Sequence, residues 1–536
     1  MKNILKYITG TLLASFIIAA CNDDEGNYNY LTEDELNEQI IRIDTTGMEN
    51  RYAFSSRYNL GDVIKLSPKV HYLYPEDLKY SWIVYDYPYS SVEVGNTTMY
   101  PQPDTISHDL NIEWTVDLKP GWHTCQFIVQ DTVRGLSASM NMGGYFTVNS
   151  AGSRSGVFLL SEYDGQTDID FYSSNLCLIY EGDVAVPHYY SQELGHGMLP
   201  GKPMYMGYAG DSWSGGYYYV FTEDNAYRLN FDGLELMETF DEMFYQTPNY
   251  RPQMMRFVNN CEFLVNDGKL HVLYHDKAND RKFSAPISGD YQAGVYLNDE
   301  TRTTWRPTAG AINADQIIFD EKNMKFRPYF QRDIQISEFR PTVADAFADA
   351  NKIPAKPIAM RGGAGGKTYA IIPVDGIPYF YMFNFYNVVD DGDLSADGAN
   401  SIIDLSGCKD IMNLKYFTAN NHGSAFYYAT DKTLYSFSPT SGQTTANEIY
   451  TCADGEEITC LTVFYSEGGG GFPTAGYALW IGVWDESKKE GKLLEWEIDA
   501  DNGVPSVFWG PMFGADRAET PYVTTGFGKI KSIVAI

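Results

Sequence analysis

The sequence has few positively charged residues for its length. Its 536 residues include 39 Lys and Arg against 70 Asp and Glu, which gives a formal net charge of −31 at pH 7. Nucleic-acid backbones and anionic lipid surfaces are bound mainly through Lys and Arg, so an acidic chain is a poor partner for either. The composition therefore argues against nucleic acid as a ligand, although it identifies no other ligand.

Motifs of known enzymes are also missing from the sequence. It contains no nucleophile elbow and no protease triad signature. The segment RGGAGGKT from Arg361 to Thr368 ends like a P-loop, but that motif requires Gly where Arg361 stands, and a strand pattern follows it. We interpret it as a flexible loop. The missing motifs favour a non-enzymatic protein. An enzyme stays open as an alternative, because the paired carboxylates of a glycoside hydrolase cannot be recognised from their spacing in the sequence.

Cysteine and histidine are scarce, and their spacing indicates few sites. There is no CxxC motif, which argues against a zinc knuckle or a thioredoxin-like site. Cys452 and Cys460 flank a turn-like segment and could form a hairpin disulfide in an oxidising compartment, and two buried free thiols are an equal alternative. His271 and His275 have the spacing of helical zinc ligands, but in their strand pattern this spacing corresponds to about 13 Å.

One acidic segment overlays most of a calcium-binding loop. Asp393, Ser395 and Asp397 alternate before Gly398, and Asp404 follows further along. Alternate oxygen ligands and a Gly turn suit a hard cation such as Ca²⁺. Because the usual hydrophobic position is occupied by an Asn and no flanking helices are indicated, a solvated acidic loop is the alternative. We expect no other cofactor.

The amino terminus resembles a bacterial lipoprotein signal. A short basic start precedes an apolar run from Tyr7 to Ala20, which is too short for the ~20 residues of a membrane-spanning helix. The run IAAC ending at Cys21 resembles a lipobox, in which signal peptidase cuts before the Cys and the thiol is acylated. This resemblance predicts a signal peptide over residues 1–20 and a lipid anchor on Cys21. An ordinary signal peptide is the alternative.

An acidic tether over residues 21–31 follows the lipobox. Its sequence NDDE, directly after Cys21, resembles the export signal of Bacteroidetes surface lipoproteins, which implies an outer-membrane protein facing the cell exterior. A lipoprotein facing the periplasm, with a merely solvated acidic linker, is the alternative. No second apolar run of spanning length occurs in the sequence.

Residues 32–150 show the pattern of one immunoglobulin-like β-sandwich. Short runs rich in β-branched and aromatic residues are separated by turn residues at sandwich-like intervals; they are Val63–Leu66, Tyr80–Val84, Gln126–Val129 and Tyr145–Val148. Trp82 lies in one of these apolar runs. We predict that it is the core tryptophan of the sandwich rather than a ligand contact.

Three segments of this region resemble the PKD-like domain of Bacteroidetes lipoproteins. They are YSWIVYD, CQFIVQDTVRG and YFTV, and the tether CNDDEGNYNY resembles the opening of the same lipoprotein family. The resemblance covers about the first 150 residues. It departs from an ordinary PKD domain where Asp86-Tyr87-Pro88 replaces the usual Gly-Asp-Gly.

Beyond a short polar linker over residues 151–155, the sequence repeats. Seven segments each contain a β-rich run, a turn with Asp or Asn, and a second run, which is typical of a hairpin. They begin at Gly156, Gly216, Cys261, Ile317, Lys367, Ser424 and Gly476, about 53 residues apart on average. This period is close to the ~50 residues of a kelch-type propeller.

We therefore predict an all-β protein in which a β-propeller, of seven blades by this count, occupies residues 156–536. Six or eight blades fit nearly as well, and a large β-sandwich or two stacked β-domains are alternatives. The final segment GFGKIKSIVAI could complete the blade that contains the first hairpin, because circular closure brings the two ends of a propeller together.

Loops at one end of a propeller converge on its central channel and can build a binding site there. Aromatic and Arg residues between the hairpins are the candidates for ligand contact: Trp213, Tyr250, Arg251, Trp305 and Arg361. Taken singly, each of them fits packing better than ligand contact, so we consider the five only as a group.

The PKD-like resemblance implies an accessory role in nutrient uptake. Such lipoproteins look like partners of SusC/SusD-type outer-membrane transporters, which implies a glycan or peptide ligand and attachment to the membrane through the amino-terminal lipid. This inference is made from the family and not from a site. A propeller hydrolase acting on glycan or peptide, and a structural or adhesive surface protein, are the alternatives.

Overall fold

The structure is a computed structural model of the whole chain. The residues that it describes are 32, 39–46, 57–59, 61–87, 89, 92–94, 97–100, 102–119, 121–142, 145–149, 156–177, 183–211, 215–231, 233–258, 261–275, 281–297, 315–330, 333–339, 349–364, 367–383, 401–439, 444–465, 474–507 and 520–535. The chain divides into two compact units, Met1–Ser150 and Ala151–Ile536, called unit 1 and unit 2. The expected signal peptide, tether and lipid anchor at Cys21 lie outside the described residues.

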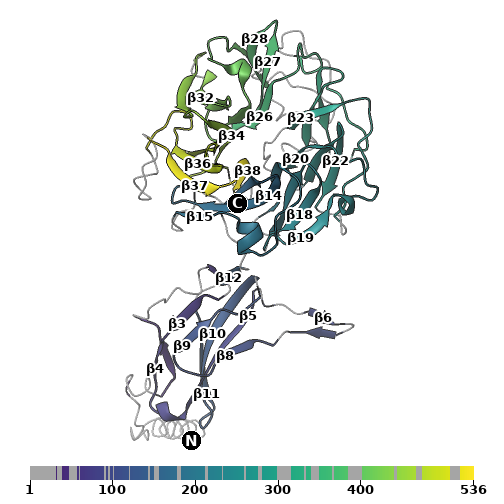
Figure 1. Ribbon diagram of the computed structural model, residues 1–536. Helices are drawn as coiled ribbons and strands as arrows, with labels where there is room; N and C mark the ends of the chain where they lie inside the picture. Colours follow the sequence, from purple (N-terminus) through teal and green to yellow (C-terminus); the bar gives the residue numbers. More distant parts are fainter. Residues whose placement is uncertain are drawn as a thin grey trace, which may run out of the picture. The chain divides into compact units, whose positions relative to one another are not determined.

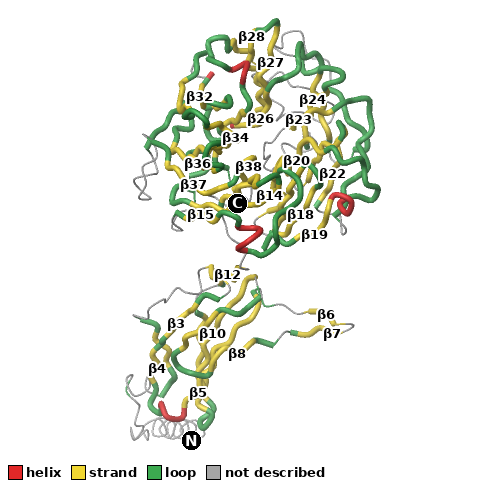
Figure 2. Tube along the Cα trace, in the orientation of Figure 1, coloured by secondary structure: helices red, strands yellow, loops and turns green. Residues whose placement is uncertain are grey.

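Both units are built from β-strands, so the predicted all-β fold class is confirmed (Figure 2). The helical elements of the described part are single turns: η2 (Pro75–Asp77), η3 (Tyr189–Glu193), η4 (Phe240–Met243) and η6 (Ile411–Asn413). Among the described residues, no helix has the length and apolar character needed to span a membrane.

The strands of unit 1 form one large sheet and three small pairs. Their bounds are β1 (Arg42–Asp44), β2 (Arg57–Asn59), β3 (Val63–Leu66), β4 (Lys69–His71), β5 (Leu78–Asp86), β6 (Val92–Val94), β7 (Thr97–Met99), β8 (Asp104–Ser107), β9 (Ile112–Thr115), β10 (Gly121–Asp131), β11 (Leu136–Asn141) and β12 (Phe146–Asn149). The large sheet has the order β2-β12-β10-β5-β8, with β11 also paired to β10, and the pairs are β1-β4, β3-β9 and β6-β7. Only β2 and β12 pair in parallel among the described strands.

The core of unit 1 lies between the large sheet and the pair β3-β9. Buried and exposed residues alternate along β3 and β9, as expected for strands with one face on a core. Trp82 in β5 is fully buried. Its ring centroid lies 4.4 Å from that of Phe127, and its Nε1 donates a hydrogen bond to the Asp109 carbonyl at 2.9 Å. The prediction that Trp82 is a core residue is confirmed.

Unit 2 consists of seven antiparallel sheets among its described residues, numbered I to VII here (Figure 1). Sheet I contains β13 (Val157–Tyr163), β14 (Gln166–Ser173), β15 (Val184–Val186) and β38 (Lys529–Ala535); sheet II contains β16 (Pro203–Asp211), β17 (Gly215–Thr222), β18 (Ala226–Asn230) and β19 (Leu236–Thr239); sheet III contains β20 (Pro252–Val258), β21 (Cys261–Asn266) and β22 (Lys269–Tyr274).

The remaining sheets continue in chain order. Sheet IV contains β23 (Ala293–Leu297), β24 (Gln316–Asp320) and β25 (Lys325–Tyr329); sheet V contains β26 (Ala359–Gly363), β27 (Lys367–Val374), β28 (Ile377–Phe383) and β29 (Ser401–Asp404); sheet VI contains β30 (Tyr416–Ala419), β31 (Phe426–Ala429), β32 (Thr433–Phe437) and β33 (Asn447–Thr451); sheet VII contains β34 (Glu456–Val463), β35 (Ala478–Asp485), β36 (Glu490–Glu497) and β37 (Tyr522–Phe527).

All seven predicted hairpins are present, and each supplies two neighbouring strands of one sheet. The expected pairing of the carboxyl-terminal segment is also confirmed, because β38 pairs with β13. One part of the sequence interpretation was wrong. Arg361 to Gly363 belong to strand β26 and pair with β27, so the start of the RGGAGGKT segment is a strand and not a loop.

The hydrophobic core of unit 2 is distributed between its sheets. One cluster of buried side chains lies between each sheet and the next, and a seventh joins sheet VII to sheet I. In that seventh cluster, Val157 and Leu159 of β13 meet Trp480 of β35. The strands on one side of every sheet also contact one another, in the order β38, β16, β20, β23, β26, β30 and β34, and β34 contacts β38.

A buried carboxylate in sheet I gives unit 2 a pH-dependent stability. Asp170 in β14 is fully buried, and its Oδ1 accepts hydrogen bonds from the Tyr163 hydroxyl at 2.9 Å and the His188 amide at 2.8 Å. Its Oδ2 has no hydrogen-bond partner in the described part of the chain. Burial raises the pKa of Asp170 to about 6, against the lowering effect of these hydrogen bonds.

We predict that Asp170→Asn stabilises unit 2 at neutral pH. The folded pKa lies above the unfolded value of about 3.9, so the folded state binds more protons between these two values. Stability therefore falls as the pH rises from about 4 to 6, and the substitution should recover up to about 3 kcal/mol at pH 7.5. Thermal unfolding at pH 4 and pH 7.5 checks this: the gain should disappear at pH 4. The exposed Asp454→Asn is the control, and an equal gain at both pH values would contradict the prediction.

Candidate functional site

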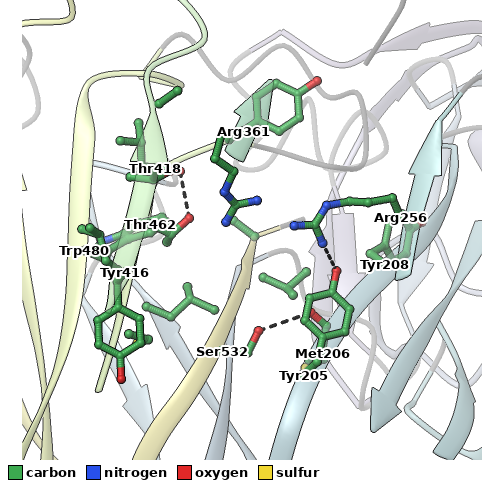
Figure 3. Close-up of a pocket in the computed structure, with 18 of the residues that line it drawn as sticks. Tyr205, Met206, Tyr208, Arg256, Arg361, Tyr416, Thr418, Thr462, Trp480 and Ser532 are labelled. Carbon is green, nitrogen blue, oxygen red and sulfur yellow. Dashed lines mark hydrogen bonds between the residues drawn. The ribbon is translucent and has the colours of Figure 1, made fainter. Parts of the chain in front are cut away.

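Unit 2 contains a cavity of about 340 Å³ at the strands that contact one another across its seven sheets. Its lining residues come from β16, β20, β26, β30, β34 and β38, with Trp480 from β35 (Figure 3). Strands of six sheets therefore place side chains around one space. This is the arrangement in which a rigid scaffold holds a few polar groups in fixed positions for a ligand.

The charged residues of the cavity are all cationic. Arg256 in β20, Arg361 in β26 and Lys531 in β38 line it, and its described lining includes no Asp or Glu. In a chain that carries 70 acidic and 39 basic residues, an all-cationic lining is unexpected. The charged side chains of the described lining thus have the sign opposite to the net charge of the protein.

Neighbouring oxygens orient the two arginines. Nη1 of Arg256 donates to the Tyr205 hydroxyl and, at 3.0 Å, to the Met255 carbonyl. Nε of Arg361 donates to the Phe417 carbonyl at 3.3 Å. Both side chains are half-buried, and Figure 3 shows both guanidinium groups pointing into the same space.

The third cation differs in its surroundings. Lys531 is half-buried and has neither a hydrogen bond nor an ion pair with any described residue. Burial, followed by repulsion from Lys529, lowers its pKa below the ordinary lysine value. The carboxylates of Glu162 and Glu457 act in the opposite direction and partly offset this lowering.

Aromatic rings and hydroxyl groups complete the lining. Tyr205 and Tyr208 of β16 and Tyr416 of β30 contribute rings, and Thr418, Thr462 and Ser532 contribute hydroxyls. Ser532 Oγ donates to the Met206 carbonyl at 3.3 Å. A cavity of this kind can stack an apolar ring face while offering hydrogen bonds to polar substituents.

A second hollow in unit 2 shows how charges are arranged elsewhere. It is lined by four lysines together with acidic residues, and one of the four, Lys531, also lines the first cavity. The other three lysines have carboxylate partners: Glu162 at 3.8 Å for Lys202, Glu486 for Lys489 and Glu457 for Lys529. This mixed lining contrasts with the cationic one of the first cavity.

Three of the five predicted ligand-contact residues are described, and of these three Arg361 alone lines the cavity. The Tyr250 hydroxyl donates to the Thr222 and Asn225 carbonyls, each at 2.6 Å, which is a structural role. Arg251 is exposed and lies 3.8 Å from Asp267. Trp213 and Trp305 lie outside the described residues.

The sequence analysis missed Arg256 and Lys531. Both occupy strands, PQMMRFV and KIKSIVA, whose remaining residues are mostly apolar. A basic residue within a strand of a buried sheet was the available signal, because such a residue must face either solvent or a polar space.

The disulfide considered between Cys452 and Cys460 is not formed, and all six described cysteines are free. The reason is packing: Cys452 belongs to the cluster between sheets VI and VII, and Cys460 to the cluster between sheets VII and I. Burial raises the pKa of Cys452 to about 11 and that of Cys460 to about 12. Both therefore stay protonated thiols at neutral pH.

The metal-site hypotheses have different outcomes. Asp393, Ser395 and Asp397 lie outside the described residues, and Asp404 ends β29 with its Oδ1 accepting a hydrogen bond from the Ser406 amide at 2.7 Å. His271 Nδ1 is 2.9 Å from the Ser284 carbonyl, whereas His275 pairs with Glu262, so the two do not share a metal. The described residues contain no group of three or more metal-ligating side chains.

A known protein family matches the amino-terminal third of the chain. The sequence model of the PKD-like family matches residues 21–203. This segment belongs to the PKD-like family. The match covers unit 1 from residue 21 onward and continues through β13, β14 and β15 of unit 2. The PKD-like resemblance inferred from YSWIVYD and CQFIVQDTVRG is confirmed. No protein with a curated description matches the chain.

Solved structures give only loose similarity to this chain. A DUF4784 family protein from Bacteroides caccae is 8% identical with a TM-score of 0.29, over 77% of this chain and 96% of that chain. The extracellular domain of the hybrid two-component system BT4673 of B. thetaiotaomicron is 9% identical with a TM-score of 0.36, over 82% and 68%. PorZ of Porphyromonas gingivalis is 9% identical with a TM-score of 0.34, over 66% and 39%. At these TM-scores, none of them indicates this chain's fold or function.

Proposed function

We propose that the protein is a lipid-anchored outer-membrane lipoprotein that captures a nutrient at the cell surface, as an accessory of a SusC/SusD-type uptake system. The observation that supports this most is the cavity of unit 2, where polar and aromatic side chains from six sheets meet around about 340 Å³. A ligand is bound in a preorganised space of this kind, which holds a few polar groups in fixed positions.

Unit 2 is, in this proposal, a seven-bladed β-propeller. Seven sheets, seven clusters between them and the pairing of β38 with β13 support a closed ring in which the last strand completes the first blade. The cavity is then part of the central channel, lined by the innermost strands of six of the seven blades. This is the place where a propeller commonly offers a concave site on a rigid frame.

The proposed anchor is the acylated thiol of Cys21, followed by the acidic tether NDDE. Acyl chains hold a protein at a bilayer because each buried CH₂ contributes about 0.8 kcal/mol, and more than one chain is needed for stable attachment. The tether would direct the lipoprotein to the outer face, leaving units 1 and 2 in the medium.

Replacing Cys21 tests the anchor directly. We predict that Cys21→Ser shifts the protein from the outer-membrane fraction to the soluble fraction, because the acylated thiol is lost. Cell fractionation with immunoblotting measures the distribution. A companion variant with Ala at positions 23, 24 and 25 should stay in the membrane but resist protease added to intact cells. If the Cys21→Ser protein remained in the membrane fraction, the lipid anchor would be excluded.

Affinity purification of the native protein from detergent-solubilised outer membranes tests the uptake role. A co-purifying SusC/SusD-type transporter would support it. Turnover of glycan or peptide substrates by the purified chain would instead favour a propeller hydrolase, and stable binding to another envelope protein alone would favour a structural or adhesive role. Either of these two results would replace the proposed function.

A further inference from the structure

We infer that unit 1 has a binding site of its own, an aromatic face that binds a neutral glycan chain through the C–H faces of its sugar rings. This site belongs to unit 1, whereas the cavity described above belongs to unit 2, and it does not depend on the proposed function. The aromatic face consists of six residues on the large sheet and its adjoining loops: Tyr85, Tyr87, Tyr89, Tyr100, Trp122 and Tyr145.

The aromatic face lies on the side of the large sheet that points away from the core. Trp82 and Val84 of β5 are part of the core of unit 1, so the alternation along the strand turns Tyr85 to the other side. The ladder between β5 and β10 (Figure 1) continues past the end of β5, because the Tyr87 amide donates to the Trp122 carbonyl at 2.8 Å. The solvent side of an antiparallel sheet is usually polar. Aromatic residues gathered there are therefore available to a ligand.

The rings of the face are exposed and hold one another in position. The exposed aromatic side chains in the described part of unit 1 are Tyr87, Tyr89, Tyr100 and Tyr145, and all four belong to the face. The Tyr145 ring centroid lies 4.9 Å from that of Tyr87 and 5.3 Å from that of Trp122, with interplanar angles of 17° and 28°. Such offset stacks fix the rings and leave part of each ring face open, as the exposed fractions of 43% for Tyr87 and 46% for Tyr145 show.

The chemistry of the face indicates a neutral glycan. The C–H groups of a pyranose ring have a small positive charge, and they pack against the negative face of an aromatic ring. The hydroxyls of Tyr87, Tyr100 and Tyr145 have no hydrogen-bond partner among the described residues, so they can exchange hydrogen bonds with sugar hydroxyls. None of the six residues is charged. Rigid Tyr and Trp side chains also lose little conformational entropy when a ligand binds.

The size of the face argues against a protein partner. Four rings of about 200 Å² each, at roughly half exposure, offer roughly 400 Å². A standard protein interface takes about 800 Å² from each partner. The exposed aliphatic residues Val133 and Leu136 do not enlarge the face, because they follow the far end of β10, about 30 Å along the strand from Trp122. A few sugar rings fit the available area better.

Affinity electrophoresis of the mature full chain tests this inference. Each gel contains one neutral polysaccharide, which is a β-glucan, an arabinoxylan, a galactomannan or starch. We expect at least one of them to retard the natural chain, and isothermal titration with oligosaccharides of that polysaccharide then measures the affinity. Because ligand and face are both neutral, a higher ionic strength should leave the affinity unchanged. If none of the four polysaccharides retards the chain, the inference is overturned.

Substitutions link the binding to the rings. Tyr145→Leu keeps an apolar side chain but removes the flat ring, so it should weaken binding at least tenfold, and Tyr87→Ala should do the same. Tyr145→Phe keeps the ring and should stay within threefold of the natural affinity. Val133→Ala changes an exposed residue elsewhere in unit 1 and is the control, with unchanged affinity expected. Thermal unfolding of each variant shows whether unit 1 keeps its transition.

The outcomes separate this inference from its alternatives. Glycan binding that persists unweakened in Tyr87→Ala and Tyr145→Leu would assign it to another part of the chain and overturn the inference. An equal loss in Tyr145→Leu and Tyr145→Phe would exclude ring stacking at Tyr145. Self-association that these variants abolish, without any glycan binding, would make the face a contact between two copies instead. The proposed function fails on different grounds, namely release of no protein by Cys21→Ser and no transporter in the purification.

Discussion

A chain that ends at Gly528 is expected to lose the folded structure of unit 2. The deleted strand β38 pairs with β13 from Lys529 to Ala535 and supplies buried residues to the clusters on both sides of sheet I, among them Ile530 and Val534. Without it, β13 would present an unpaired edge, and two hydrophobic clusters would open to water. Because unit 2 buries its core between consecutive sheets, opening one junction should destabilise the whole unit.

Size-exclusion chromatography and circular dichroism of the truncated chain measure this effect. We expect aggregation, or loss of the unfolding transition of unit 2, while unit 1 keeps its own transition because its core is separate. Deletion of residues 22–31 is the control for shortening the chain. A truncated chain that stays monomeric and unfolds cooperatively at an unchanged temperature would contradict the closing role of β38 and remove the main support for a closed ring.

The hairpins of unit 2 could be predicted because their strands have both faces buried. In β24 and β31 every residue is buried, and their sequences, QIIFD and FYYA, each contain an uninterrupted apolar or aromatic run. The turns added a second signal. Asp164-Gly165, Asp267-Gly268 and Asp375-Gly376 all have positive φ at both positions, which two-residue hairpin turns of the primed type require.

The strands that line the cavity could not be recognised in the same way. One side of each faces a polar space, so these strands contain Gly, Pro, Thr and Arg where the hairpins contain aromatics; β26 is AMRGG and β16 begins with Pro203. Their convergence depends on how sheets far apart in the sequence pack together. Arg256, Arg361 and Lys531 are separated by 105 and 170 residues, and no local pattern relates them. Trp82 was predictable because its apolar neighbours are in its own strand.

Glu262→Ala is expected to cause the largest loss of stability among the single substitutions considered. Glu262 in β21 of sheet III is buried and accepts hydrogen bonds from the Tyr219 hydroxyl of sheet II and from His275 Nε2. The Tyr219 hydroxyl in turn accepts a hydrogen bond from Arg228 Nε at 2.6 Å. Burial, followed by the Glu262 carboxylate, raises the pKa of Tyr219 far above its ordinary value, so the hydroxyl keeps its proton and donates it to Glu262.

Removing the carboxylate leaves buried donors without their acceptor and leaves the charge of Arg228 less compensated. Breaking a buried, hydrogen-bonded charge in this way costs about 3–5 kcal/mol. Glu262→Gln keeps one carbonyl acceptor and should cost about 1–2 kcal/mol, because a neutral amide replaces a charged partner. The exposed Glu193→Ala should stay within about 0.5 kcal/mol of the natural chain.

Urea unfolding of the four proteins, followed by a probe that reports unit 2, measures these differences. The graded order, with Ala far below Gln and Gln below the natural chain, distinguishes loss of the polar network from loss of packing volume, since Gln and Glu have nearly the same size. If Ala alone lowers the stability and Gln costs nothing, the volume of the side chain and not its charge holds sheets II and III together. If neither lowers the free energy of unfolding by 1 kcal/mol, the junction between sheets II and III depends on its aromatic cluster alone, of which Tyr219, Phe221 and Phe283 are members.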